Sequence, residues 1–239
     1  MKTISQHQRK FIFTICILLT CLLPNQLSFG YETISKTYAV KPFSQLRASS
    51  GFDVQFIHSD ENKVIIEIGE DAAKKLMVEN KGKELIIQLQ DCINVSTKTM
   101  KATVYGNSLS SITMSGATTF SSDHTFGEKD MKINTSGASK MTILLKTENL
   151  DIDLSGASKL TVKGTAIKQM IEMSGASDYN GKGCKSMNIG ISCSGASKAK
   201  LDCSGTLDAE ASGASHVTYL NEPEKLYKKQ SGASEIEKD

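Results

Sequence analysis

Apolar and polar residues alternate in short stretches through the first part of the chain, from residue 31 to about residue 105. The alternation is clear in Gly51–Ile57 and in Lys63–Ile68, and Asp60–Asn62 is the turn expected between them. A period of two is typical of strands that bury one face. Because these stretches have no fixed spacing, the sequence predicts strands here without a regular repeat.

A second pair of strands is expected a little further along. Met77–Asn80 and Glu84–Leu89 flank Lys81-Gly82-Lys83, which predicts a hairpin closed by a glycine-containing turn. Before this hairpin, Gly69–Lys75 contains good helix formers but is short. We expect a loop or a single helical turn there, because a stable helix needs greater length.

A tetrapeptide repeat organises the rest of the chain. Ser-Gly-Ala-Ser, once in the form Ser-Gly-Ala-Thr, begins at Ser115, Ser136, Ser155, Ser174, Ser194, Ser212 and Ser231. Successive copies are 18–21 residues apart. A period of this size indicates a solenoid, in which each coil buries its apolar side by stacking on its neighbours.

Two mostly apolar columns precede the tetrapeptide when the copies are aligned. The third position before the first serine holds Ile112, Ile133, Ile152, Ile171, Ile191, Ala209 and Lys228. The position directly before it holds Met114, Thr135, Leu154, Met173, Cys193, Ala211 and Gln230. Since the residues between these columns are polar, we expect parallel strands with one face inside the coil.

The alternation resumes after the tetrapeptide in a different register. One column there comprises Phe120, Met141, Leu160, Tyr179, Ala199, Val217 and Ile236. Each coil is thus expected to contain a strand, a Ser-Gly-Ala-Ser corner and a second strand. A variable loop such as Lys146–Asn149, or a third short strand within it, would close the coil.

The residue types of the tetrapeptide suit a sharp corner. Glycine adopts positive φ without penalty, and alanine fits where the inside of a bend has little room. The serines can bond to local backbone groups or to the serines of the coils above and below. The alternative interpretation is an array of hydroxyl groups that recognises a repetitive surface such as a glycan.

The predicted fold is all-β. It is a single-stranded parallel β-helix of right-handed sense, with about seven coils in residues 106–239 and irregular N-terminal strands in residues 31–105. We expect residues 31–239 to form one domain.

Residues 1–30 have the pattern of a secretory signal peptide. Lys2, Arg9 and Lys10 precede the apolar run Phe11–Leu23, and small residues stand at Ser28 and Gly30. Export to the periplasm, the outer surface or the extracellular space is therefore expected. A lipid anchor at Cys21 is the alternative, and it would be the chain's only attachment to a membrane.

Charge argues against nucleic acid as a partner. The whole chain has a net charge of +2, and removal of residues 1–30 with their three basic residues leaves −1. Because lysines and acidic residues are interspersed, no basic patch is expected to follow a phosphate backbone.

The cysteines after residue 30 have two interpretations. They are Cys92, Cys184, Cys193 and Cys203. An even number in an exported protein is compatible with disulfides, and Cys184 and Cys203 are 19 residues apart, which would place them on adjacent coils. Cys193 stands in an apolar column, which favours buried free thiols.

The order of these elements resembles the head GIN domain family. The resemblance is carried by Gly51–Val54, Leu85–Ile87, Ala102–Tyr105 and Ser111–Ala117, followed by the Ser-Gly-Ala repeats, and it covers about Val40 to Ile236. It implies an exported bacterial β-helical protein of the kind described as an autotransporter adhesin head. It implies no catalytic residues.

Candidate binding residues lie in the outward columns on either side of the corner. Asp151, Asp153 and Glu172 precede it, and Lys140, Lys159 and Lys198 follow it. Paired carboxylates can act as acid and base or bind calcium, so a carbohydrate-active enzyme is one alternative. Alternating charges are also the ordinary arrangement of an exposed sheet, and His216 is expected to be a solvated member of the lysine column.

The chain contains none of the sequence motifs of nucleophilic serine, zinc protease or phosphate-binding sites. We therefore expect a non-enzymatic envelope interaction module that binds a glycan or another envelope component, without a metal or cofactor. A purely structural element is a further alternative, in which an open coil end pairs with another copy. The charged segment Glu235–Asp239 would protect that edge.

Overall fold

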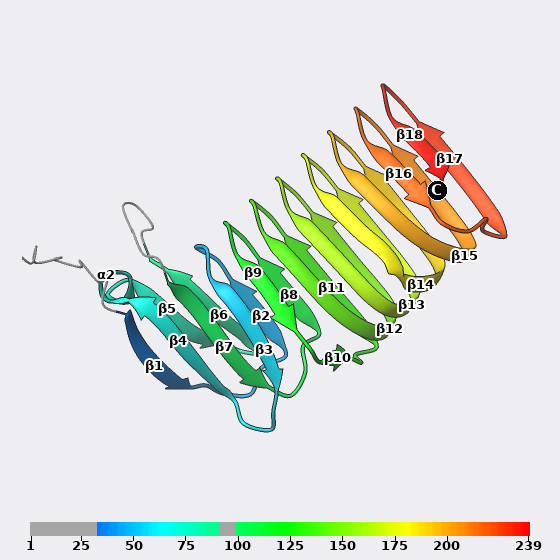
Figure 1. Ribbon diagram of the computed structural model, residues 1–239. Helices are drawn as coiled ribbons and strands as arrows, with labels where there is room; N and C mark the ends of the chain where they lie inside the picture. Colours follow the sequence, from blue (N-terminus) through cyan, green and yellow to red (C-terminus); the bar gives the residue numbers. More distant parts are fainter. Residues whose placement is uncertain (1–32, 91–98) are drawn as a thin grey trace, which may run out of the picture. The chain divides into compact units, whose positions relative to one another are not determined.

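The computed structural model describes residues 33–90 and 99–239, which belong to one compact unit of β-strands (Figure 1). The predicted signal peptide, the alternative anchor residue Cys21, and Cys92 lie outside the described residues. No helix in the described part of the chain is long and apolar enough to cross a bilayer.

The first part of this unit contains seven strands and one helical turn. They are β1 (Thr33–Ala39), β2 (Gln45–Ala48), β3 (Asp53–His58), β4 (Lys63–Gly69), α2 (Glu70–Ala73), β5 (Leu76–Lys81), β6 (Glu84–Leu89) and β7 (Met100–Gly106). The predicted helical turn and the hairpin of β5 and β6 are confirmed. The predicted turn at Asp60–Asn62 joins β3 to β4, but these strands do not pair, because β7 lies between them.

The solenoid follows. Its strands are β8 (Ser111–Met114), β9 (Thr119–Ser122), β10 (Thr125–Phe126), β11 (Asp130–Thr135), β12 (Lys140–Leu154), β13 (Lys159–Met173), β14 (Asp178–Cys193), β15 (Lys198–Ala211), β16 (His216–Tyr219), β17 (Lys225–Gln230) and β18 (Glu235–Lys238). All of them pair in parallel. The predicted β-helix of about seven coils is confirmed, whereas its right-handed sense stays a prediction.

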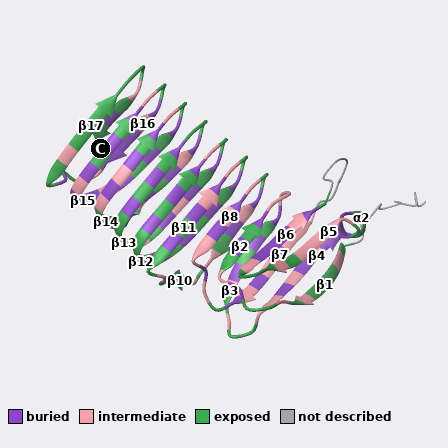
Figure 2. Cartoon of the chain, turned by 180° about the vertical axis from the view of Figure 1, so that it is seen from behind, coloured by how far each residue is buried: buried purple, intermediate pink, exposed green. Residues whose placement is uncertain are grey.

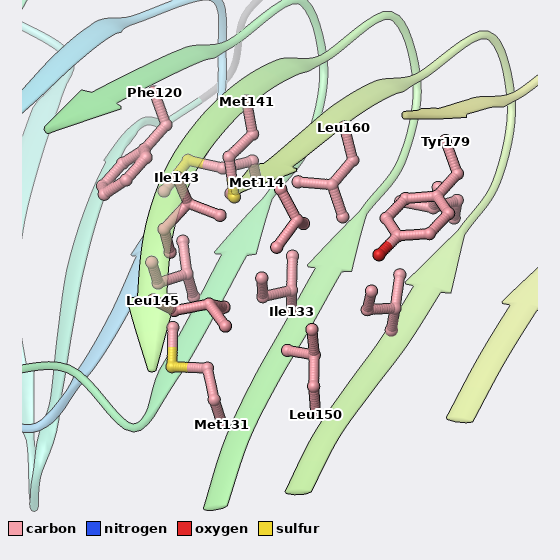
Figure 3. Packing of buried hydrophobic residues seen from close by; sticks show 14 of the residues in the cluster. Met114, Phe120, Met131, Ile133, Met141, Ile143, Leu145, Leu150, Leu160 and Tyr179 are labelled. Carbon is pink, nitrogen blue, oxygen red and sulfur yellow. The ribbon is translucent and has the colours of Figure 1, made fainter. Parts of the chain in front are cut away.

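The predicted columns are also confirmed. Ile112, Ile133 and Ile152 are register partners on successive coils, as the alignment on the tetrapeptide requires. Buried and exposed residues alternate along the strands, which Figure 2 shows as bands across the coils. Figure 3 shows Met141, Leu160 and Tyr179 side by side in the coil interior.

One expectation about the coil is wrong. Lys146–Asn149 is neither a variable loop nor a separate short strand, because it lies within the continuous strand β12. The chain turns within the strand where two exposed residues, Glu148 and Asn149, follow each other and the alternation is reset. The register with β13 is unchanged on both sides of this bend, with Thr147 opposite Ala166 and Asn149 opposite Lys168.

The corner glycines are required for two reasons. Gly156 has φ +71, a conformation that L side chains rarely adopt. A Cβ atom on Gly156 would also lie 2.6 Å from the carbonyl oxygen of Gly137 on the preceding coil. That same oxygen accepts a 2.7 Å hydrogen bond from the amide of Ala157. Backbone hydrogen bonds therefore join successive corners, and the two backbones lie too close together there for a side chain to fit between them.

The expected position of alanine in the corner is wrong, whereas the expected bonding of serine to local backbone groups is confirmed. Alanine is exposed in every copy, so it does not fill the inside of the bend. The final serine points inward instead: Ser139 is 1% exposed, and its hydroxyl donates a 2.8 Å bond to the carbonyl of Ser136. In four of the first six copies the buried final hydroxyl bonds in this way to the carbonyl three residues before it, which supports the structural interpretation of the motif.

The N-terminal strands are more regular than the sequence suggested. β2 and β3 pair in parallel with β8 and β9 and so form a further coil beneath the first tetrapeptide. Its corner is Ser49-Ser50-Gly51, in which Ser50 and Gly51 both have positive φ. The first repeat therefore does not begin the stack, since a degenerate corner precedes it.

The three described cysteines are free and buried. The expectation that Cys184 and Cys203 are equivalent is wrong, because an irregularity between β14 and β15 places Cys203 opposite Ser186. Burial raises the pKa of Cys184 and of Cys193 to about 11. These thiols are packing residues, since reactivity requires the thiolate.

Candidate binding surfaces

The six predicted binding residues lie on two separate faces. We call the outward side of the strands that lead into the corners the pre-corner face; it comprises β2, β8, β11, the second halves of β12–β15, and β17. The post-corner face comprises β3, β9, the first halves of β12–β15, β16 and β18. Asp151, Asp153 and Glu172 are on the first face, and Lys140, Lys159 and Lys198 are on the second. All six side chains are exposed.

The lysines of the post-corner face do not form a continuous cationic stripe. Asp178 stands between Lys159 and Lys198 in the column, and its carboxylate is 3.7 Å from the Lys159 ammonium. Because the pair is exposed, it contributes little to stability. The column is therefore a mixed-charge row that offers no strong site by itself.

The acidic residues of the pre-corner face are only partly brought together. Asp153 and Glu172 are register partners on adjacent strands. Asp151 instead has Lys132 and Met170 as its partners in the column. Asp153 and Glu172 therefore adjoin each other, whereas Asp151 has no carboxylate as a register partner.

Asp151 lines a groove of about 660 Å³ on the pre-corner face. The groove crosses five successive strands, from Gln45 on β2 to Met170 on β13. Asp153 and Glu172 are not among the residues that line it. Of the six predicted binding residues, Asp151 alone lines this groove.

The groove combines charged, amide and apolar groups. Asn149 donates a 2.7 Å hydrogen bond to the carboxylate of Asp130, which holds both side chains at the groove wall. Lys168 is the register partner of Asn149 and adds a cation. Such a surface can offer hydrogen-bond donors and acceptors beside an apolar platform.

Met170 supplies the apolar platform, and its position depends on a glycine. Its side chain is 46% exposed and reaches over the next strand towards Gly190. A Cβ atom on Gly190 would lie 3.0 Å from the Met170 sulfur and 3.2 Å from its methyl carbon. The glycine therefore leaves the space in which the methionine lies.

A second groove of about 700 Å³ lies at the bend of the coils and is more apolar. Ile167 and Met187 line it and are 53% and 57% exposed. Lys129 and Glu148, whose charged groups are 3.5 Å apart, stand at its polar side. An exposed apolar groove edged by charges is typical of an interaction site.

Sequence reasoning missed most of the groove residues. Met170 occupies the same column as Asp151, so the alignment places it beside a predicted residue, but a lone methionine in an outward column does not indicate a binding site. Gln45 could not be placed, because the coil formed by β2 and β3 lacks the tetrapeptide. The apolar groove was also missed, since the bend was interpreted as a loop.

Solved structures with the same fold come from bacterial proteins. The chain superposes with a TM-score of 0.82 on a "putative adhesin" from Bacteroides fragilis, at 18% identity, covering 87% of this chain and 97% of that one. For a "putative lipid binding protein" from Parabacteroides distasonis the TM-score is 0.70 at 16% identity, covering 88% and 98%. For a further "putative adhesin" from Parabacteroides distasonis it is 0.67 at 15% identity, covering 88% and 98%. At these identities the similarity establishes the fold alone.

The sequence itself identifies the family. No curated protein matches it. One family model, described as "Putative auto-transporter adhesin, head GIN domain", matches residues 42–223. This match covers the coil formed by β2 and β3 and most of the solenoid. The chain therefore belongs to the head GIN domain family, as the order of its strands and repeats predicted.

Proposed function

We propose that the protein is an exported, non-catalytic adhesin-like module that binds an extended glycan of the cell envelope along the pre-corner face. The observation that carries the proposal is the groove across β2, β8, β11, β12 and β13. Its strands are about 4.8 Å apart, so side chains of equivalent positions recur along it at that interval. An extended polymer can therefore contact side chains of several coils at once.

The chemistry of the groove suits a carbohydrate. Asp151, Asn149 and Lys168 offer acceptors and donors for sugar hydroxyl groups, and Met170 offers an apolar surface for the C–H face of a ring. Family membership and the N-terminal segment, with its signal-peptide pattern, support an exported, surface-directed role. The register partners of Asp151 are Lys132 and Met170 and not a second carboxylate, which supports binding over catalysis in this groove.

The test is to measure binding of the purified protein to an array of bacterial envelope glycans and then to determine the affinity for the best ligand by calorimetry. Asp151→Ala and Met170→Ala should each weaken binding by about 1–3 kcal/mol if they contact the ligand in a desolvated site. Lys159→Ala on the post-corner face is the matched control and should bind normally. Unchanged binding by both groove variants, or the absence of any glycan ligand, would contradict the proposal.

The apolar groove supports a second candidate function, the binding of a lipid acyl chain. Ile167 and Met187 provide the apolar contacts there, and one protein of the same fold is named as a lipid-binding protein. A fluorescent fatty acid probe separates the two functions. Ile167→Asp should abolish binding of the probe and leave glycan binding intact, whereas a probe that does not bind the unmodified protein would exclude this candidate.

A further inference from the structure

Three side chains that can ligate a metal ion meet on the post-corner face, where β16 and β18 pair (Figure 1). His216 on β16 and Glu235 on β18 are register partners. Glu237 lies two residues further along β18 and therefore points to the same face. Each residue offers one ligand atom, and these three atoms all lie within 4.8 Å of one another. A single ion can thus reach all three side chains.

The separations fit ligands of a shared ion. His216 Nδ1 is 3.4 Å from Glu235 Oε2, and His216 Nε2 is 3.3 Å from Glu237 Oε1. Both distances exceed the roughly 2.7–3.2 Å of an ordinary N–H···O hydrogen bond. Two ligands that are each about 2.0–2.1 Å from a tetrahedral zinc ion lie about 3.3 Å apart. The two distances start from different ring nitrogens, so one ion can use only one of them, and the other carboxylate must reach the same ion from within the 4.8 Å limit of the group.

The charges of the group suit a divalent cation. Two carboxylates face one imidazole, and the ion pairs of Glu235 and Glu237 within the described residues are both with His216. Lys198 is the register partner of His216 on the preceding coil, and its positive charge would repel a bound cation. Its side chain is exposed and long enough to turn into solvent. Lys182, on the coil before that, is paired with Asp239 instead.

We propose that His216, Glu235 and Glu237 bind a zinc ion or a similar divalent transition metal. One imidazole nitrogen and a carboxylate oxygen from each glutamate are the ligands, and water completes the coordination. Nitrogen ligation favours zinc, nickel or copper over calcium and magnesium, which prefer oxygen alone. The imidazole nitrogen that does not bind the ion keeps its proton.

The position of the site gives the ion a structural role. Its ligands come from two strands, β16 and β18. These strands are otherwise joined by a short ladder of four residue pairs. Ile236 is the buried residue of β18. A bound ion would fasten β18 to the coil before it. Metal binding should therefore slow the opening of β18, because an ion that binds only the closed state stabilises that state.

The experiment is a calorimetric titration of the metal-free purified protein with zinc chloride near neutral pH. Hydrogen exchange of the β18 amides is followed with and without zinc. The unmodified protein should bind zinc, and zinc should slow exchange in β18. His216→Gln and Glu237→Gln should each reduce the affinity at least about tenfold and abolish the zinc effect on exchange. Circular dichroism of each variant verifies that the coils remain folded.

Two variants serve as matched controls. Glu222→Gln removes a carboxylate that pairs with Lys238 near the same strand but lies outside the group. His124→Gln removes a histidine at the other end of the stack. Both should bind zinc as the unmodified protein does. An unmodified protein that does not bind zinc, or affinity that survives in both His216→Gln and Glu237→Gln, would overturn the proposal and leave these residues as a simple ion-pair group.

Discussion

The phenol hydroxyl of Tyr179 donates a 2.6 Å hydrogen bond to the side-chain oxygen of Gln169 inside the solenoid. Both residues are buried, and the Gln169 amide donates onward to the hydroxyl of Ser186. Burial raises the pKa of Tyr179 well above its ordinary value, so the phenol remains a neutral donor. Gly181 makes room for the ring, because a Cβ atom there would lie 2.8 Å from the phenol oxygen.

We expect Tyr179→Phe to lower the free energy of unfolding by about 1–3 kcal/mol, because Gln169 would keep a buried oxygen without its donor. Chemical denaturation measures the change. Tyr227→Phe is the matched control, since its side chain is 58% exposed and should alter stability by less than about 0.5 kcal/mol. Equal stability of the two variants would show that the interior bond contributes nothing.

The corner glycines lead to a second prediction. Gly156→Ala should destabilise the protein by at least about 1–3 kcal/mol, since it combines positive φ with a Cβ position 2.6 Å from a carbonyl oxygen. Gly127→Ala is the control, because no atom lies within 4 Å of its Cβ position and its φ is not positive. Thermal unfolding compares them. A Gly156→Ala protein as stable as the Gly127→Ala protein would contradict the close approach of the corners.

Stability should also depend on the protonation of His124. Its ring stacks on His58 with centroids 4.3 Å apart and meets the edge of Phe126. Burial, and then the charge of His58, lower the pKa of His124 below its ordinary value of 6.5. The unfolded chain therefore binds a proton at a higher pH than the folded protein does. Stability should be unaffected well above pH 6.5 and should fall as the pH decreases below it.

The measurement for this prediction is the free energy of unfolding at pH 8 and pH 5. His124→Gln should reduce the difference between the two values, because the titrating group is absent. Asp123 lines the same cavity as the two rings, and its negative charge would oppose the shift. A His124→Gln protein with the same pH dependence as the unmodified protein would assign the effect to other groups.

In the last described coil, polar residues occupy positions that hold apolar core residues in the earlier coils. Lys228 occupies the isoleucine column, where its ammonium bonds to the carbonyl of Ile236 and lies 4.9 Å from the ring centroid of Tyr219. Polar terminal coils keep solenoids soluble by closing the apolar stack. Lys228→Ile should therefore promote association of the purified protein through this edge, which light scattering after size-exclusion chromatography detects.

The control for this change is Lys229→Ile, which is on the same strand but faces outward next to Glu210. It adds an equal apolar surface without extending the core column. If both variants associate equally, the effect comes from general hydrophobicity and not from an opened coil end. If neither associates, Lys228 does not protect the edge.

The solenoid columns could be predicted because periodicity alone determines which residues share a face. Ile112 and Ile171 are three coils apart, and their alignment follows directly from the tetrapeptide spacing. The orientation of Ala157 and Ser158 could not be predicted in this way, since both residues are small enough for either side of the corner. The backbone bond from Ala157 to Gly137 fixes it, and no sequence pattern reports that bond.

The candidate sites were harder to predict because they depend on irregularities. The coil that begins at Ser174 has 20 residues and the next has 18, so the register between them changes and separates Cys184 from Cys203. The sequence contained this signal in the uneven spacing. Likewise, His216 and Glu235 are 19 residues apart in one column, and this spacing predicts that they are neighbours on successive coils.

The close contact of Gly137 and Gly156 also limits how such a chain can change in length. Loss or gain of one residue in a strand would exchange the inner and outer side chains that follow it unless a bulge absorbs the change, as between β13 and β14, whereas loss or gain of a whole coil would keep the corners stacked. The coil is therefore the natural unit of insertion and deletion. Relatives of different lengths should differ by whole coils, each of which moves the far end of the binding face by about 4.8 Å.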